Sequence, residues 1–224
     1  MNIIKKILIK IIPNNILKIY GVNKIILFKY GYLRSIKNKI PVDKNNEVIP
    51  WYTYPAIEYI NQINLKDKTI FEYGTGNSSL YFAKKAKRVI SVEDNKEWFE
   101  KINKNNTTNL KIFFEEEKNN YLNSIKKTNE KFDIIVIDAN YRLECCHKIK
   151  NSLKEDGIVI LDNSDRHPDC ASYLRDELGL IEMDFHGFGP INCYTWTTSI
   201  FVSKNFNPKK QKGLHPTSPI GGIE

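Results

Sequence analysis

The feature that most constrains this chain is the regular alternation of short apolar runs with helical patterns between residues 69 and 203. Seven runs have the length and composition of β-strands: 69–73, 88–92, 110–114, 133–137, 158–161, 180–186 and 197–203. The segments predicted to be helices between them are 77–86, 96–104, 120–127, 142–153 and 169–178. Strands that alternate with helices form βαβ units, in which helices cover both faces of a parallel sheet.

Two details of the strands refine this prediction. In the runs DIIVI (133–137) and IVIL (158–161), every residue after Asp133 is apolar, which is typical of strands buried on both faces. The segment GFGPINCYT between the last two runs is too short for a helical crossover, so these two strands must be antiparallel. The sequence therefore predicts an α/β protein with a doubly wound, mostly parallel, seven-stranded Rossmann-like sheet whose last strand is antiparallel.

The rest of the chain forms two flanking segments. Nine of the 34 Lys and Arg residues lie within the first forty residues, which contain no Asp or Glu, whereas the remainder is close to neutral. We predict a basic amphipathic helical extension at 1–48, a main domain at 49–204 and an extended, Pro- and Gly-rich tail at 205–224. A linker is expected at 35–50, followed by a helix in TYPAIEYINQI, 53–63.

The extension begins with apolar residues at helical spacing, namely Ile3, Ile4, Ile7, Leu8, Ile11 and Ile12. Pro13 and the two asparagines after it are expected to end this helix, and a second apolar and basic stretch runs from Ile16 to Tyr32. Two interpretations stay open, because amphipathicity alone does not separate them. Residues 1–34 could lie on an anionic membrane surface, or they could pack on the body of the protein or on a second subunit, giving a homodimer.

The cysteine content and the absence of long apolar runs indicate an intracellular protein. The four cysteines, Cys145, Cys146, Cys170 and Cys193, include no C-x-x-C pair, and two adjacent cysteines are poor disulfide partners. No run approaches the length of a membrane span, and no signal-peptide cleavage site is evident. We therefore expect a cytoplasmic protein, peripheral on the inner face of the membrane if the extension binds there.

The first predicted strand ends in a glycine turn, TIFEYGTGNSSL, from which a helix starts immediately. A P-loop needs a Lys-Ser/Thr pair after its last glycine, and a dinucleotide site needs a third glycine where this chain has Ser79. Glu72, two residues before Gly74, is unfavourable beside a pyrophosphate but suits a ligand that carries an ammonium and a sulfonium group. Glu93, at the end of the next strand, is placed to accept both hydroxyls of a ribose, which dinucleotides and S-adenosyl compounds share.

With Phe71–Gly76 and Glu93 in this arrangement, the sequence resembles the class I S-adenosylmethionine-dependent methyltransferases over roughly residues 50–203. The resemblance implies S-adenosylmethionine as the cofactor and the sheet order 3-2-1-4-5-7-6, with strand 7 antiparallel. It also implies a polar contact to adenine after the third strand, at Asn120 or Tyr121. The residues implied to bind the cofactor are Glu72, Gly74, Gly76, Ser78, Glu93, Asp94, Asn120 and Tyr121.

Polar residues also follow the fourth and fifth predicted strands, which are neighbours in a doubly wound sheet. Asp138 ends one strand, and Asp162 and Asn163 end the other, so their side chains are expected to converge on the ligand side of the sheet. Hard oxygen ligands of this kind suit Mg²⁺ or a similar divalent cation. The pairing resembles the metal-dependent O-methyltransferases of the catechol, caffeoyl-coenzyme A and macrolide-sugar types, which implies Asp138, Asp162 and Asn163 as metal ligands.

The identity of the catalytic base stays open at this stage. The catechol-type enzymes have a lysine three residues after the first Asp, and here that position is Tyr141, followed by Arg142. Asp165 and His167, in the segment NSDRHPDC, are further candidates besides Asp138. The segment GFGPINCYTW is expected to border the substrate site, where its aromatic residues would stack on a flat or sugar-like substrate or pack the loop.

The sequence favours methylation of a hydroxyl on a small molecule or glycan, assisted by a metal, as in polysaccharide modification. A hydroxyl is a poor nucleophile at neutral pH unless a metal or a base lowers its pKa. One alternative is a nucleic-acid amino-methyltransferase, but DANY stands where those enzymes have D-P-P-Y, and the basic extension lacks interleaved aromatics, which argues against a nucleic-acid partner. The other alternative is a non-catalytic, membrane-associated adaptor, and the retained acids Glu72, Glu93 and Asp138 argue against it.

Overall fold

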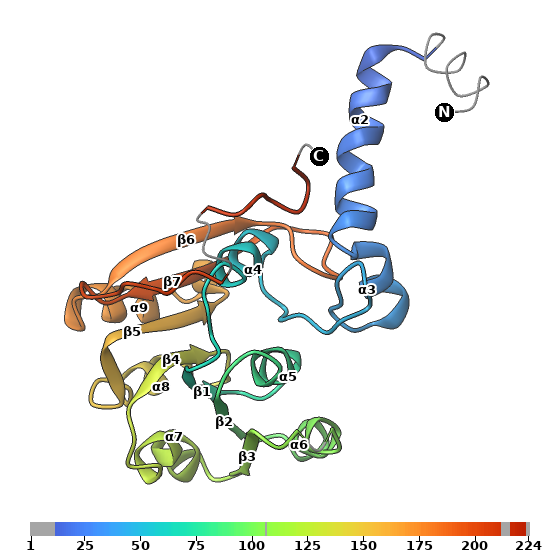
Figure 1. Ribbon diagram of the computed structural model, residues 1–224. Helices are drawn as coiled ribbons and strands as arrows, with labels where there is room; N and C mark the ends of the chain where they lie inside the picture. Colours follow the sequence, from blue (N-terminus) through green and yellow to red (C-terminus); the bar gives the residue numbers. More distant parts are fainter. Residues whose placement is uncertain (1–11, 106, 212–215, 223–224) are drawn as a thin grey trace.

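The computed structural model describes residues 12–105, 107–211 and 216–222, which form a seven-stranded sheet with helices on both faces (Figure 1). The strands are β1 Thr69–Tyr73, β2 Arg88–Glu93, β3 Leu110–Phe114, β4 Phe132–Ile137, β5 Leu153–Asp162, β6 Ile181–Gly187 and β7 Trp196–Val202. The helices of the body are α4 Tyr54–Ile60, α5 Asn77–Ala83, α6 Lys96–Asn103, α7 Lys118–Lys127, α8 Arg142–Cys146 and α9 Pro168–Ser172, with short 3-10 and π-helical turns at Ser164–Arg166 and Tyr173–Glu177.

The strand order is β3-β2-β1-β4-β5-β7-β6, which is the order that the resemblance implied. Strands β1 to β5 pair in parallel, and β7 pairs antiparallel with both β5 and β6. The predicted fold class is therefore confirmed, including the single reversed strand. The short connection between β6 and β7 causes the reversal, because it can turn the chain but cannot cross the sheet.

Each face of the sheet packs against its own set of helices, because successive residues of a strand point to opposite faces. Phe71 and Ile135 belong to a buried cluster with residues of α7, α8 and α9. Ile70 and Val136 belong to a second cluster with residues of α4 and α5. Burial of β4 on both sides agrees with its apolar run Ile134–Ile137, and the buried Asp133 before it pairs with Lys68 and Lys154.

Local sequence explains where the helices beside the carboxyl edge of the sheet begin. Asn95 caps α6, since its side chain accepts a hydrogen bond from the backbone N–H of Trp98 (2.9 Å). Glu117 caps α7 in the same way through the N–H groups of Asn119 and Asn120. These two caps place Trp98 and Tyr121, in the first turns of α6 and α7, beside the end of β1.

One predicted helix is much shorter in the structure. The helix expected at 142–153 ends as α8 at Cys146, and Leu153 already belongs to β5. The backbone oxygen of Ser152 accepts a hydrogen bond from the N–H of Phe132 (2.8 Å), and Leu153 pairs with Phe132 at the start of β4. Pairing with the neighbouring strand thus replaces the local helical preference of this segment.

The N-terminal extension consists of α2 Asn14–Lys24, a π-helical turn at Ile25–Lys29 and α3 Tyr32–Asn38. The sequence placed Asn14 at the end of a helix, but in the structure it begins α2; the helix predicted before it lies almost entirely outside the described residues. No residue of α2 is buried, and the helix projects away from the body (Figure 1). The base of the extension is attached, because the Tyr30 hydroxyl donates a hydrogen bond to Glu58 on α4.

The remaining segments follow the surface of the body. The first residues of the expected linker belong to α3, and Val42 then forms an isolated antiparallel bridge with Val48. The C-terminal segment is largely irregular and bridges to the body where Lys210 pairs with Ile63. The four cysteines are free thiols. Of the helices in the described part of the chain, none combines the length and the apolar character that crossing a membrane requires. The boundaries proposed at 48/49 and 204/205 stay predictions.

Candidate functional site

The glycine turn between β1 and α5 brings three strand ends together. Gly74 has a φ of +86°, in the left-handed region that favours glycine, and its N–H donates to the Val92 oxygen on β2 (3.0 Å). A Cβ atom at Gly74 would overlap the backbone oxygen of Asp138, which directly follows β4. Glycine at this position therefore lets β1, β2 and β4 approach closely at their carboxyl ends.

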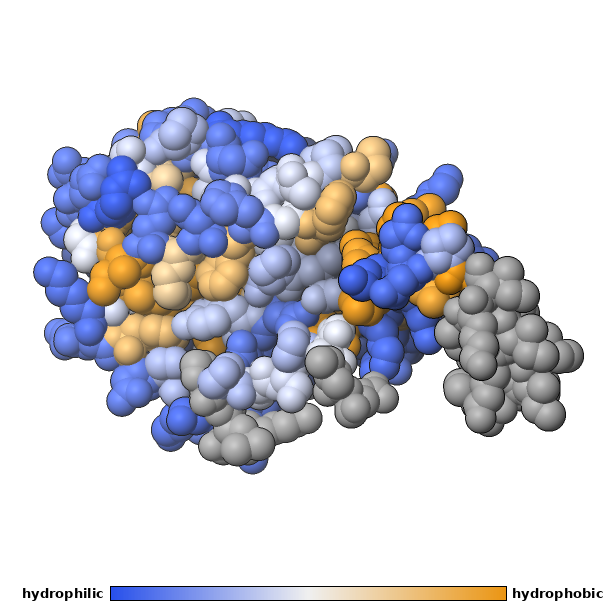
Figure 2. Space-filling model, turned by 90° about the horizontal axis from the view of Figure 1, so that it is seen from above, coloured by the Kyte–Doolittle hydropathy of each residue, from blue (hydrophilic) through white to orange (hydrophobic). Residues whose placement is uncertain are grey.

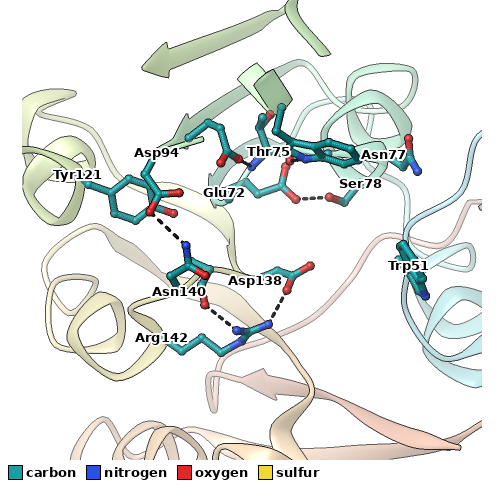
Figure 3. A pocket seen from close by; sticks show the side chains of 15 residues that line it. Trp51, Glu72, Thr75, Asn77, Ser78, Asp94, Tyr121, Asp138, Asn140 and Arg142 are labelled. Atoms are coloured by element: carbon teal, nitrogen blue, oxygen red, sulfur yellow. Dashed lines mark hydrogen bonds and ion pairs between the residues drawn. The ribbon is translucent and has the colours of Figure 1, made fainter. Parts of the chain in front are cut away.

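Glu72 is fully buried near the end of β1, where α5 holds its carboxylate. One oxygen accepts a hydrogen bond from the Ser78 hydroxyl (Figure 3), and the other accepts one from the Ser79 hydroxyl. Burial raises the pKa of Glu72 to about 8, because desolvation opposes the charged form more strongly than the two hydroxyls favour it. A cationic group in the adjoining cavity would favour the ionised form, as the sequence prediction requires.

Glu93 ends β2, and two backbone donors fix its carboxylate. One oxygen accepts from the Thr75 N–H (2.8 Å), and the other accepts from the Asn95 N–H (2.9 Å). Burial raises the pKa of Glu93, and these two hydrogen bonds partly offset the rise. Each carboxylate oxygen can accept a second hydrogen bond, so the hydroxyls of a ribose could still bind.

A cavity of about 280 Å³, which we call the β1 cavity, lies at the carboxyl ends of β1, β2 and β4 (Figure 3). Its walls include seven of the eight predicted cofactor residues, namely Glu72, Gly74, Gly76, Ser78, Glu93, Asp94 and Tyr121. The eighth, Asn120, is exposed on α7 and does not line the cavity. Sequence reasoning missed the side chains of Trp51, Thr75, Asn77, Trp98 and Asn140, which also line it.

Asp138 lies on the floor of the β1 cavity and is paired with Arg142 (Figure 3). Arg142 Nη2 lies 2.6 Å from Asp138 Oδ1, and Nη1 donates to the backbone oxygen of Ala139 (2.6 Å). The guanidinium also reaches Asn163 Oδ1, at 3.4 Å from Nη2, while Nε is buried without a partner among the described residues. Burial raises the pKa of Asp138, and the charge and hydrogen bond of Arg142 act in the opposite direction.

A second cavity of about 250 Å³, which we call the β5 cavity, lies beside the end of β5. Two residues, Asp138 and Trp51, line both cavities. The other residues that line the β5 cavity are Asp162, Asn163, Arg166, Asn192, Tyr194 and Trp196. The structure thus confirms that the end of β5 and the loop before β7 face a common space, as strand order alone predicted.

Asp162 is buried in the wall of the β5 cavity and is held from β7. Its Oδ1 accepts hydrogen bonds from the Thr198 hydroxyl (2.6 Å) and from the Trp196 indole N–H (3.1 Å). Burial and the nearby charge of Asp138 raise the pKa of Asp162 to about 8. Asp162 therefore orders β7 and Trp196 against the end of β5.

Trp51 reaches both cavities because the chain before α4 is fastened to β6 and β7. The N–H of Thr53 donates to the Thr198 hydroxyl (3.0 Å), and the Thr53 hydroxyl donates to the backbone oxygen of Phe185 (2.8 Å). The N–H of Tyr54 donates to the oxygen of Phe188 (2.8 Å). No local sequence signal marks Trp51, since its position depends on strands more than a hundred residues further along the chain.

Three of the candidate bases lie outside both cavities. The Tyr141 ring packs against the buried Tyr121 (centroids 6.0 Å apart), and the exposed Asp165 accepts a hydrogen bond from the Thr197 N–H (3.0 Å). His167 lies beside Asp169 and Cys170, with potential ligand atoms within 4.8 Å of one another, and burial lowers its pKa. Of the five candidates, only Asp138 and Arg142 line the β1 cavity, and of these two only Asp138 also lines the β5 cavity.

The three predicted metal ligands converge, but a cationic side chain already lies among them. Arg142 contacts an oxygen of Asp138 and the oxygen of Asn163, which are two of the three groups that the metal would need. The third, Asp162, has Oδ1 occupied by two donors from β7. This arrangement does not fit a divalent cation, because Arg142 supplies the positive charge that would otherwise come from the metal.

Comparison with known proteins identifies the fold. No family model matches the chain. One segment is 39% identical over 77 residues to polyamine aminopropyltransferase 2 of Aquifex aeolicus (strain VF5), and it spans 29% of this chain but only 15% of that protein. Among solved structures, the chain is similar to precorrin-6y C5,15-methyltransferase from Geobacter metallireducens GS-15, with a TM-score of 0.55, 11% identity, and coverage of 75% of this chain and 96% of that chain.

A protein from Staphylococcus aureus that is named after the caffeoyl-CoA O-methyltransferases is similar as well. Its TM-score is 0.56 at 19% identity, with 85% of this chain and 100% of that chain covered. At such identities the likeness concerns the fold and not the substrate. The fold is that of the class I S-adenosylmethionine-dependent methyltransferases, in agreement with the sheet order and the glycine turn.

Proposed function

We propose that this protein transfers the methyl group of S-adenosylmethionine to a hydroxyl of a small-molecule or glycan acceptor. The observation that supports this most is that the β1 and β5 cavities meet at two shared residues, Asp138 and Trp51. A group transfer needs two binding sites that bring the reacting atoms together. Asp138 is also the one candidate base that reaches both sites.

The β1 cavity has the donor and acceptor groups that the cofactor needs. Glu93 would accept the ribose hydroxyls, and Glu72 would face the positively charged end of the ligand. Among the described residues that line this cavity, Glu72, Glu93, Asp94 and Asp138 are acidic and Arg142 alone is basic, which disfavours a di- or triphosphate. When bound there, S-adenosylmethionine supplies an electrophilic methyl group.

Asp138 would orient the acceptor hydroxyl and take its proton. Arg142 pairs with Oδ1, so Oδ2 is the oxygen available to the acceptor. Asp138 Oδ2 would accept the proton of the acceptor hydroxyl as its oxygen gains the methyl group, and the bound cofactor would supply that group with its sulfur as the leaving group. Arg142 holds the carboxylate in place through two hydrogen bonds, one to Asp138 and one to the neighbouring backbone.

The β5 cavity supports a ring that bears hydroxyl groups as the acceptor. Trp51, Tyr194 and Trp196 provide aromatic surface, and Asn163 and Asn192 provide amide groups. Aromatic rings pack against the apolar face of a sugar or a flat ring, and amides fix the hydroxyls at its edge.

We propose that this transfer needs no resident metal, because Arg142 occupies the place between Asp138 and Asn163. This replaces the metal-assisted reaction that the sequence favoured. Exhaustive chelation should leave turnover unchanged. Replacing Arg142 by Ala should expose the acidic cluster and create Mn²⁺ binding that electron paramagnetic resonance detects, with Arg88→Ala as the control. Loss of activity on chelation, restored by Mg²⁺, would return the site to the metal-dependent class.

Calorimetry with candidate cofactors tests the proposal directly. S-adenosylmethionine or its demethylated product should bind, and NAD should not. Glu93→Gln should weaken the binding about tenfold, because a neutral amide accepts hydrogen bonds less strongly than a carboxylate, whereas the exposed Glu155→Gln should bind normally. Tight binding of NAD with none of S-adenosylmethionine would refute the proposal.

A second candidate is transfer of an aminopropyl group, favoured by the segment that is 39% identical to a polyamine aminopropyltransferase. The same β1 cavity would then bind decarboxylated S-adenosylmethionine, and the acceptor would be an amine. Competition between S-adenosylmethionine and its decarboxylated form for the β1 cavity distinguishes methyl transfer from aminopropyl transfer, because the protein should bind the cofactor that it uses more tightly. Nucleic acid is the third acceptor to test, and binding of single-stranded RNA that competes with acceptors at the β5 cavity would support it.

A further inference from the structure

One apolar face of α2 is uncovered in the described part of the chain. Ile16, Ile19 and Tyr20 have the i, i+3, i+4 spacing that places them on one side of the helix, and each is more than half exposed. Figure 2 shows apolar residues gathered where the extension leaves the body. A soluble helix normally buries such a face, so a partner outside the described chain is expected to cover it.

The charged residues around that face are all basic. From residue 12 to residue 40 the extension carries six basic residues and no acidic one, namely Lys18, Lys24, Lys29, Arg34, Lys37 and Lys39. The sequence before α2 adds three lysines and no acid. Apolar side chains flanked by basic residues alone are typical of helices that lie in the interface of an anionic bilayer.

The charge also decides between two occupants of this face. Packing the extension against the same segment of a second copy would bring together two segments that each contain nine Lys and Arg residues and no Asp or Glu, which is electrostatically unfavourable. An anionic bilayer neutralises these charges and covers the apolar side chains at the same time. We propose that the N-terminal extension docks this protein on an anionic lipid bilayer through Ile16, Ile19, Tyr20 and the basic residues of the segment.

The base of the extension would transmit this docking to the body. The Tyr30 hydroxyl donates to Glu58 on α4, and the Tyr32 hydroxyl donates to the backbone oxygen of Asn192 (3.1 Å), in the wall of the β5 cavity. The proposal does not depend on the reaction catalysed, since it rests on α2 and its charges.

Sedimentation of the full-length protein with vesicles tests the proposal. We expect binding to vesicles of phosphatidylcholine with phosphatidylglycerol, little binding to phosphatidylcholine alone, and release by high salt. Ile19→Glu should weaken binding roughly tenfold or more. Ile181→Glu is the matched control and should bind normally, because Ile181 is 50% exposed on β6 and Ile19 is 60% exposed on α2.

Charge variants provide the second arm. Lys18→Glu with Lys24→Glu should reduce binding at least tenfold, since each basic residue near an anionic surface contributes about fivefold. Reversal of Lys148 and Lys150 on the body should have little effect. Equal binding to neutral and anionic vesicles, or undiminished binding by both extension variants, would overturn the proposal. Light scattering that shows a dimer, dissociated by Ile19→Glu, would assign the face to a second copy instead.

Discussion

The β1 and β5 cavities lie at the same edge of one sheet, but different kinds of structure form them. The β1 cavity is lined mainly by residues at or just after the ends of three adjacent parallel strands, which one glycine lets meet, and Trp51 also reaches it. The β5 cavity is built from side chains of distant segments, including Trp51 before α4 and Trp196 at the start of β7. The first depends on strand order, whereas the second depends on how loops are fastened.

This difference implies a division of roles. A site made by strand ends can keep one ligand while the loops around it change, which is how doubly wound sheets bind cofactors. A site made by loop side chains can change its ligand without disturbing the sheet. The β1 cavity should therefore respond to substitutions through cofactor affinity and fold stability, and the β5 cavity through turnover and loop order.

The largest expected effect is at Asp138, which lines both cavities. Asp138→Asn keeps the shape of the side chain but removes the base that we propose, so turnover should fall by about 10²–10⁴. Cofactor affinity should change less than about threefold, because Glu72 and Glu93 are untouched. Turnover with an acceptor found by screening and calorimetry with S-adenosylmethionine measure the two quantities.

Asp67→Asn is the control for Asp138→Asn, since Asp67 is exposed, lines neither cavity and precedes the start of β1, at the opposite end of the strand from the β1 cavity. Equal loss of turnover and cofactor affinity in Asp138→Asn would contradict the comparison. Asp138 would then be part of the cofactor site alone.

Sequence reasoning predicted the β1 cavity better than the β5 cavity for a physical reason. Glu72, Gly74 and Glu93 follow from where strands end, and a run of consecutive residues determines this. Trp51 and Trp196 come together only through hydrogen bonds between distant segments, such as Thr53 to Thr198. A pattern read along the chain contains no record of such contacts.

The three predicted metal ligands meet in the structure, but a cationic side chain lies among them. Asp138, Asp162 and Asn163 do converge, as strand order requires. The prediction did not weigh Arg142, which stands four residues after Asp138 and pairs with it. Asp138 lies outside any helix and Arg142 begins α8, so the pair depends on the turn between them and not on a helical i, i+4 spacing.

The next largest effect is the dependence of cofactor affinity on pH, which we expect Glu72 to cause. The pKa of Glu72 is about 8 in the free protein, and a cationic ligand favours the ionised form. The affinity for S-adenosylmethionine should therefore increase by up to about tenfold for each unit that the pH rises towards 8, and it should level off above pH 8. Calorimetry in buffers of different ionisation enthalpy should detect about one proton released per ligand bound. Glu72→Gln should abolish the dependence, and Glu155→Gln should keep it.

The same residue affects stability with a definite sign. The pKa of Glu72 is about 8 in the folded protein, above its value in the unfolded chain. The folded state therefore binds more protons, and the stability contributed by this group is lost as pH rises through 8. The melting temperature of the free protein should thus fall less between pH 6 and 9 in Glu72→Gln than in the wild type. A steeper fall in the variant would contradict the assignment.

A smaller effect is expected on stability, where alanine substitutions at Gly74 and Gly179 can be compared. Gly74→Ala should lower the free energy of unfolding by about 2 kcal/mol or more, because it combines a left-handed φ with overlap on Asp138. Gly179 has a similar φ of +68° with nothing within 4 Å of its Cβ position, so Gly179→Ala should cost only about 1 kcal/mol. Denaturant unfolding measures both. Equal costs would mean that the close approach of β1 and β4 can relax.

The smallest expected effect is on the order of the loop at 188–195, which forms one wall of the β5 cavity. It shows whether this order depends on the N-terminal extension. Tyr32→Phe removes the hydroxyl that donates to the Asn192 oxygen, a hydrogen bond worth about 1 kcal/mol. Ile191, next to it, has a φ of +71°, which a β-branched residue adopts only under constraint. Amide hydrogen exchange at 188–195 should therefore become about fivefold faster, while exchange near Gly74 stays unchanged. The exposed Tyr20→Phe is the control. Unchanged exchange in Tyr32→Phe would mean that β6 and β7 alone order this loop, and that the two cavities differ less than their construction suggests.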